Sequence, residues 1–102
     1  MKIKFKKSAD NLFIWLSGEL DEFTASKSRV IIDKLLDDNL NVKKVIFNFS
    51  ELSFMDSTGI GMLLGRYKKL NQFNIPIYIT GANFSVEKIL EISGLYKIMP
   101  RY

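Results

Sequence analysis

The stretch FMDSTGIGMLLGRYKKL, residues 54–70, passes from an apolar run through a polar turn into a helical pattern. Within it, apolar side chains recur at the spacing of one helix face, at Ile60, Leu63, Leu64, Tyr67 and Leu70. We expect the helix to begin at Asp56, Ser57 or Thr58, because Asp and Ser side chains accept hydrogen bonds from the first N–H groups of a helix. The segments on either side then decide whether strands and helices alternate.

Apolar runs lie on both sides of this helix. Residues 42–49 are rich in apolar side chains, including β-branched and aromatic ones, as in a strand of a parallel sheet that is covered on both faces. Residues 75–80 predict a further strand. Pro76 must lie at its very start or on a sheet edge, because proline cannot donate to a strand ladder.

The N-terminal segment predicts a hairpin. Residues 2–6 alternate Lys with apolar side chains. After a turn at residues 8–11, residues 12–17 predict a second strand, with Leu12, Ile14 and Leu16 on one face and Phe13 and Trp15 on the other. A short turn between two strands implies that they run antiparallel. We expect residues 18–21 to end the second strand.

A helix is predicted after this hairpin, to about Asp38, with Thr24 or Asp21 as its cap. Its apolar side is formed by Ala25, Ser28, Ile31, Ile32, Leu35 and Leu36.

The C-terminal segment predicts a third helix, capped by Ser85 and extending through Ser93. Its inward side chains are expected to be Val86, Ile89, Leu90 and Ser93. Gly94 is suited to the left-handed conformation that ends helices, and Leu95 to the apolar contact that follows it. Residues 96–100 are a possible final strand.

The resulting order is β-β-α-β-α-β-α, with a possible last strand, and predicts a single α/β domain over residues 1–102 with helices packed on a mixed sheet. Right-handed crossovers bring the carboxyl ends of parallel strands to one rim. Three loops should meet there: residues 18–24, 53–59 and 80–85. Functional groups of open α/β sheets cluster at such a rim.

Composition narrows the possible functions. The chain has 102 residues, a net charge of +4, and neither cysteine nor histidine, which excludes disulfides and Cys- or His-based nucleophilic catalysis. We find no carboxylate cluster with metal-ligand spacing, and we expect no metal or cofactor. The lysines are scattered rather than arranged in a basic stripe, so we expect no DNA binding. No signal peptide and no run of roughly 20 apolar residues is present, so we expect a cytoplasmic protein without membrane contact.

The DSTG turn at residues 56–59 has two explanations. A helix cap alone accounts for Asp56 and Ser57, whereas a phosphoryl group on Ser57 would also be favoured by the N–H groups and partial positive charge of a helix start. Gly59 and Gly61 would let a partner approach the backbone closely. Gly65 is interpreted as a close-packing position against the sheet.

Catalytic and nucleotide-binding alternatives find less support in these residues. The pattern G-x-G-x-x-x-G is neither the dinucleotide fingerprint nor a P-loop, so a small nucleotide-binding protein rests on the glycines alone. Ser57 has no candidate base except its neighbour Asp56, so a hydrolase site cannot be assembled. We therefore expect a binding protein and not an enzyme.

The segments GELDEFTA (18–25), FMDSTGIGMLLGRYKKL (54–70) and ISGLYKI (92–98) resemble the STAS-domain anti-sigma factor antagonists of Gram-positive bacteria. The resemblance extends over essentially the whole chain in order. The segments LGRYKKL and GELD look more like the sporulation sigma F branch than the general stress branch. Sporulation-type members usually continue past the position of Tyr102 into a C-terminal helix, whereas this sequence ends at KIMPRY.

The resemblance implies a regulatory binding protein. Family members bind an anti-sigma factor that is also a serine kinase, and so release the sigma factor. The kinase uses ATP to phosphorylate the serine after the aspartate, here Ser57, and a metal-dependent phosphatase removes the phosphate. The implied partner-binding residues are Asp21, Met55, Asp56, Ser57, Thr58, Gly59 and Ile60. The alternative is a STAS adaptor subunit of a membrane transport complex, without phosphorylation.

Overall fold

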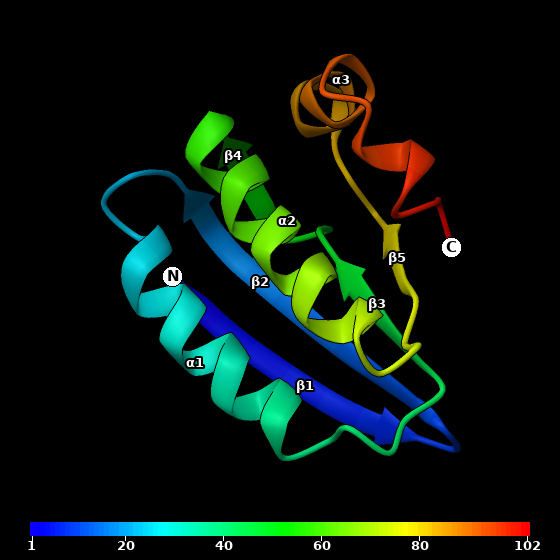
Figure 1. The fold of residues 1–102 in the computed structure, drawn as a ribbon. Helices are drawn as coiled ribbons and strands as arrows, with labels where there is room; N and C mark the ends of the chain where they lie inside the picture. The colour runs from blue at the N-terminus through cyan, green and yellow to red at the C-terminus, as the bar shows by residue number, and fades with distance from the viewer.

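A five-stranded mixed sheet forms one layer of the structure, and α1 and α2 lie against one of its faces (Figure 1). This computed structural model describes residues 1–102. The elements are β1 (Lys2–Ser8), β2 (Asn11–Leu20), α1 (Ala25–Asp37), β3 (Lys44–Asn48), β4 (Leu52–Met55), α2 (Ser57–Asn71), β5 (Ile77–Thr80), α3 (Phe84–Ile92) and the 3-10 turn η1 (Leu95–Lys97). This is the α/β architecture expected from the sequence.

The sheet order is β1-β2-β3-β5, and β4 pairs with the carboxyl-terminal end of β2. β1 and β2 form the predicted antiparallel hairpin, with Phe5 opposite Ile14, whereas the other pairs are parallel. β3 lies between β2 and β5, and its Val45, Ile46 and Phe47 are at most 1% exposed, which confirms that it is covered on both faces. β5 is an edge strand that begins just after Pro76, as predicted.

Two predictions at the end of β2 were wrong. The strand continues to Leu20 instead of ending at residue 17, and residues 52–55 form the additional strand β4 rather than only a loop. A register shift between Gly18 and Glu19 lets β2 continue alongside β4. This shift places Leu20 in the core, where it is fully buried.

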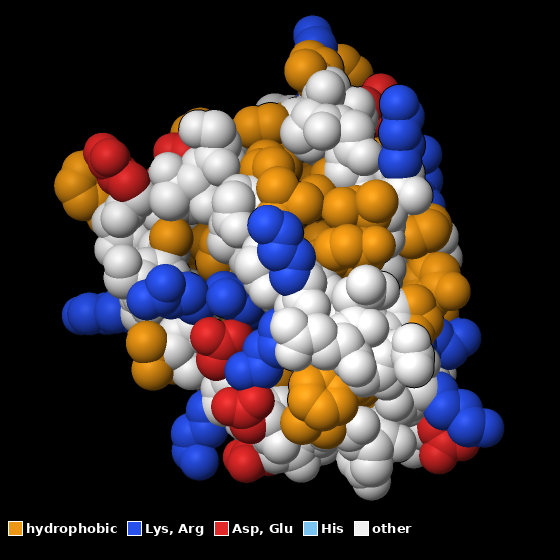
Figure 2. Space-filling model, viewed as in Figure 1, with side chains coloured by type: hydrophobic (Ala, Val, Ile, Leu, Met, Phe, Trp, Pro, Cys, Tyr) orange, Lys and Arg blue, Asp and Glu red, His pale blue; other side chains and the backbone are white.

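The buried faces of α1 and α2 differ in detail from the sequence pattern. Ile31 was expected on the inner face of α1 but is 52% exposed, because the buried stripe follows Ser28, Ile32 and Leu35. On α2 the buried positions are Gly59, Met62, Leu63, Arg66 and Leu70. Several residues that were expected on the inner faces of α2 and α3 are only half-buried: Ile60, Leu64, Tyr67 and Ile89. Figure 2 shows apolar side chains reaching the surface between these two helices.

The C-terminal segment also departs from prediction. Asn83, not Ser85, caps α3, since its Oδ1 accepts a hydrogen bond from the Val86 N–H at 2.9 Å. Ser93 is exposed rather than inward. Gly94 adopts the predicted left-handed conformation, with φ 77°, and Leu95 is buried.

Residues 96–100 do not form the possible last strand. η1 occupies Leu95–Lys97, and only Arg101 forms a single bridge, with Ile79 of β5. The carbonyl of Pro100 accepts from the Ile79 N–H, but Pro100 has no N–H with which to extend a ladder.

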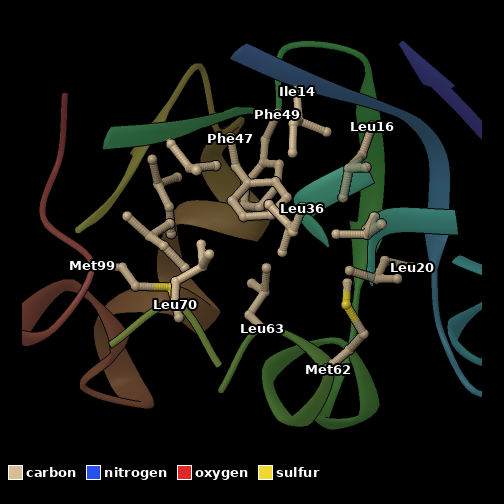
Figure 3. Close-up of a cluster of buried hydrophobic side chains, with 14 of the residues drawn as sticks. Ile14, Leu16, Leu20, Leu36, Phe47, Phe49, Met62, Leu63, Leu70 and Met99 are labelled. Carbon is tan, nitrogen blue, oxygen red and sulfur yellow. The ribbon is translucent and has the colours of Figure 1, made fainter. Parts of the chain in front are cut away.

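One apolar core of 23 buried residues joins the sheet to all three helices. In Figure 3 the rings of Phe47 and Phe49 lie in the same cluster as Leu63, Leu70 and Met62 of α2. Burial of large apolar side chains is worth roughly 1.5–3 kcal/mol each, so this core holds α2 firmly against the sheet.

Candidate functional site

The segments at residues 18–24, 53–59 and 80–85 contact one another at one rim of the sheet, as predicted, although the loop after β5 meets the start of β4 and not its end. The Asp56 N–H donates to the Leu20 carbonyl at 3.3 Å, which ties the start of α2 to the end of β2. Asn83 Nδ2 donates to the Leu52 carbonyl at 3.2 Å, which ties the start of α3 to β4. The first contact joins the loops after β2 and β4, and the second joins the loop after β5 to the start of β4.

Asp56 is the N-cap of α2. Its Oδ1 accepts from the Thr58 N–H at 2.9 Å and from the Gly59 N–H at 3.4 Å. Ser57 is therefore the first helical residue rather than the cap, and its side chain is exposed. The Ser57 hydroxyl is left accessible at the positive end of a helix.

We predict that Asp56→Ala lowers the free energy of unfolding by about 1 kcal/mol, within the usual range for a lost N-cap. Urea denaturation checks this value. Asp56→Asn is the matched control, because an amide oxygen also caps helices, and it should retain most of the stability. Equal stability of Asp56→Ala and the parent protein would contradict the capping role.

Asp21 organises the neighbouring loop. Its Oδ1 accepts from the Phe23 N–H at 2.9 Å and the Thr24 N–H at 3.1 Å. Thr24 occupies the N-cap position of α1, but its side chain makes no cap hydrogen bond and instead donates to the Glu19 carbonyl at 2.8 Å. Neither residue is thus a side-chain cap of α1, and together they brace the loop beside Asp56.

Met55 and Gly59 lie beneath this surface. Met55 is 5% exposed, and a Cβ built on Gly59 would lie 2.6 Å from Met55 Cγ and 3.1 Å from Leu20 Cγ. Gly59 is therefore required for the close approach of α2 to β2 and β4. Ile60 is half-buried against the core.

The other two glycines of α2 have a different environment. A Cβ on Gly61 or Gly65 would meet no atom within 4 Å. The interpretation of Gly65 as a close-packing position against the sheet was therefore wrong, because the space beside it is open.

Comparison with known proteins agrees with this geometry. Residues 2–102 match the family model of the STAS domain. An anti-sigma F factor antagonist of Paenibacillus polymyxa is 35% identical over 102 residues, which are 100% of this chain and 86% of the relative. The chain belongs to the STAS-domain family of anti-sigma factor antagonists.

Solved structures support the same assignment for this STAS domain. The anti-sigma factor antagonist SpoIIAA in its unphosphorylated form superposes with a TM-score of 0.81 at 29% identity, over 99% of this chain and 88% of that chain. The phosphorylated form of the Bacillus cell fate determinant SpoIIAA gives a TM-score of 0.72 at 28% identity, over 99% and 91% of the two chains.

The rim of this STAS domain also presents phenylalanines that the sequence analysis did not single out. Phe23 and Phe84 are each 84% exposed, and Phe54 is 45% exposed. Their signal in the sequence is an aromatic residue in or beside a predicted loop, outside any apolar repeat. Exposed aromatic side chains are typical of protein–protein contacts.

This STAS domain has neither a cluster of metal-ligating side chains nor a helix able to cross a membrane. No group of three or more Asp or Glu side chains is arranged to hold a metal ion. None of its helices has the length and apolar character needed to cross a bilayer.

Proposed function

We propose that this STAS domain, extending over residues 1–102, is an anti-sigma factor antagonist controlled by phosphorylation of Ser57. Its unphosphorylated form binds an anti-sigma factor that is also a serine kinase, and thereby releases the sigma factor. The resemblance to the sporulation branch and the full-length relative favour the sigma F system. The protein acts in the cytoplasm as a binding partner and catalyses no reaction.

The observation that carries this proposal is the position of Ser57. Its side chain is exposed at the first position of α2, while Asp56 supplies the cap. A kinase can therefore reach the hydroxyl without unfolding the helix. Asp56, the adjacent carboxylate, is occupied with the Thr58 and Gly59 N–H groups, which argues against its acting as a base for Ser57.

The proposed contact surface comprises two kinds of residue. Asp21, Asp56, Ser57, Thr58 and Ile60 face the anti-sigma factor or shape the loops that do. Met55 and Gly59 act from beneath, by setting how closely α2 approaches the two strands. The kinase-bound nucleotide lies near Ser57 in the complex, and a metal-dependent phosphatase later removes the phosphate. No DNA, membrane or resident cofactor takes part.

The test is incubation of the protein with its cognate kinase and ATP, followed by intact mass measurement. We expect one phosphate on the parent protein and none on Ser57→Ala. Phosphate on Ser57→Ala would move the site to Thr58 or another hydroxyl. No phosphate on either protein would favour the alternative of a STAS adaptor in a membrane transport complex.

We further predict that Ser57→Ala folds with a change in unfolding free energy of less than about 0.5 kcal/mol, because Asp56 and not Ser57 forms the cap. This variant should bind the anti-sigma factor like the unphosphorylated parent protein and should keep binding after treatment with kinase and ATP. Thermal denaturation and a pull-down on the same sample check both expectations. A loss of stability near 2 kcal/mol would show that Ser57 has a structural role.

A further inference from the structure

Gly61 and Gly65 form a bare strip on α2, one turn apart and in line with Ser57. A Cβ at either position would meet nothing within 4 Å, so packing inside the protein does not require glycine there. Glycine in a helix interior weakens the helix relative to alanine. The strip therefore carries a stability cost that no contact within the chain explains.

The strip forms one wall of a groove between α1 and α2. The groove has a volume of about 450 Å³, and it is lined by Thr58, Gly61 and Gly65 from α2 and by Arg29 from α1. Thr58 is the neighbour of Ser57, so the groove begins at the proposed phosphorylation site. Its backbone-lined wall can accept another polypeptide at close range.

Arg66 provides a second observation that points to a ligand. It also lines the groove and is only 8% exposed. Its Nε lies 2.8 Å from Asp33 Oδ1, at ion-pair distance, but Nε, the buried Nη1 and Asp33 Oδ1 all lack a well-aligned hydrogen bond. Buried arginine nitrogens without an acceptor are costly, so this side chain is suited to an additional anionic partner.

Positive charge exceeds negative charge at this groove. Arg29 is exposed and forms no ion pair, whereas Asp33 is shared between Arg66 and Lys69. Burial lowers the pKa of Arg66, the charge of Asp33 opposes this shift, and the nearby charge of Arg29 lowers the pKa further. Figure 2 shows Lys and Arg side chains over α1 and the space between α1 and α2, with Asp and Glu side chains among them. An anion in the groove would relieve this repulsion.

We propose that the anti-sigma factor lies along α2 from Ser57, with its backbone against Gly61 and Gly65 and an Asp or Glu side chain in the groove beside Arg29 and Arg66. This inference rests on the proposed function and extends its contact surface beyond the rim. A carboxylate of the partner protein is favoured over a free anion, because only a polypeptide uses the bare strip that connects the groove to Ser57. An arginine guanidinium also matches a carboxylate in geometry.

The glycine variants test the strip. Gly61→Ala and Gly65→Ala should each raise Tm by about 4–8 °C, because alanine favours the helix and the space for its methyl group is open. Each should also weaken binding to the cognate anti-sigma factor at least tenfold, by calorimetric titration. Raised stability combined with lost affinity is not expected of a glycine with a purely structural role. Unchanged affinity in both variants would overturn the inference.

A charge variant tests the groove. Arg29→Glu should weaken binding at least tenfold, whereas Lys27→Glu should change the affinity less than threefold at physiological salt. Lys27 is the matched control because it is exposed on the same helix but does not line the groove. Equal effects of the two variants would indicate only long-range attraction and would contradict the carboxylate contact.

These outcomes separate the inference from the proposed function. If the parent protein fails to bind the anti-sigma factor, the proposed function itself is wrong. If the parent protein binds and is inactivated by phosphorylation, but the glycine and Arg29 variants bind normally, only the inference is wrong. Shifts of the Gly61 and Gly65 amide signals in NMR spectra on addition of ATP or inorganic phosphate alone would assign the groove to a small anion instead.

Discussion

Phosphorylation of Ser57 is expected to weaken binding to the anti-sigma factor at least 100-fold and to leave the fold intact. Asp21 and Asp56 already bring two carboxylates to this rim, and a phosphate adds about −1.5 to −2 charges. If the phosphate lies roughly 6 Å from one unit of negative charge on the partner's nucleotide, the repulsion is about 5 kcal/mol at an effective dielectric constant near 20. A 100-fold loss, about 2.8 kcal/mol, needs only part of this repulsion.

The fold should tolerate the same charge, because the start of α2 favours a negative group by about 0.3–1 kcal/mol. Calorimetric titration of the enzymatically phosphorylated protein checks affinity, and thermal denaturation of the same sample checks stability. Ser57→Asp should show a smaller loss of affinity, since a carboxylate carries less charge than a phosphate. It should be no less stable than Ser57→Ala.

Salt provides an additional control on this prediction. If charge repulsion causes the loss, raising the ionic strength should recover part of the affinity of Ser57→Asp. Normal binding by the phosphorylated protein at low salt would contradict the proposal that this rim is a phosphorylation-controlled interface.

Gly59→Val is expected to destabilise the domain by about 3 kcal/mol. The sequence analysis expected Gly59 to let a partner approach the backbone, whereas the structure shows that its missing side chain makes room for Met55 and Leu20. A Cβ at residue 59 would lie 2.6 Å from Met55 Cγ and 3.1 Å from Leu20 Cγ, so α2 would have to move away from the sheet. Overpacking of a core typically costs 1–3 kcal/mol, and valine adds two methyl groups beyond this Cβ.

The matched control is Gly61→Val, on the same helix two residues away. Its Cβ enters open space, so its unfolding free energy should differ from that of the parent protein by less than about 1 kcal/mol. The substituted side chain is the same in both variants, so urea denaturation compares the packing environments of the two positions. Similar stability losses at the two positions would show that Gly59 is not a packing position.

The local features of the fold were predictable from the chain itself. The hairpin of β1 and β2 follows from strict alternation in residues 2–6 and a short turn before the next apolar run, and the start of α2 follows from an aspartate before a helical repeat. Each depends on residues within a few positions of one another. The rim could also be predicted, because crossover handedness places the ends of parallel strands together.

Other features depend on partners distant in sequence. β4 has only four residues, and it forms because the end of β2, more than 30 positions earlier, offers a free edge to residues 52–55. Asn83 replaces the predicted cap Ser85 while its Nδ2 also donates to the Leu52 carbonyl. No local pattern contains these contacts.

The glycines of α2 show most clearly the difference between features set by local sequence and features set by tertiary contacts. The sequence by itself determined that Gly59, Gly61 and Gly65 lie on one helix that begins beside Ser57, because capping and helical periodicity are local properties. Only the tertiary structure decided that Gly59 is packed against Met55 and Leu20, whereas Gly61 and Gly65 border an open groove. The physical reason is that a missing side chain leaves no sign in the sequence of what occupies its space, and only the neighbouring elements determine whether that space is core or surface.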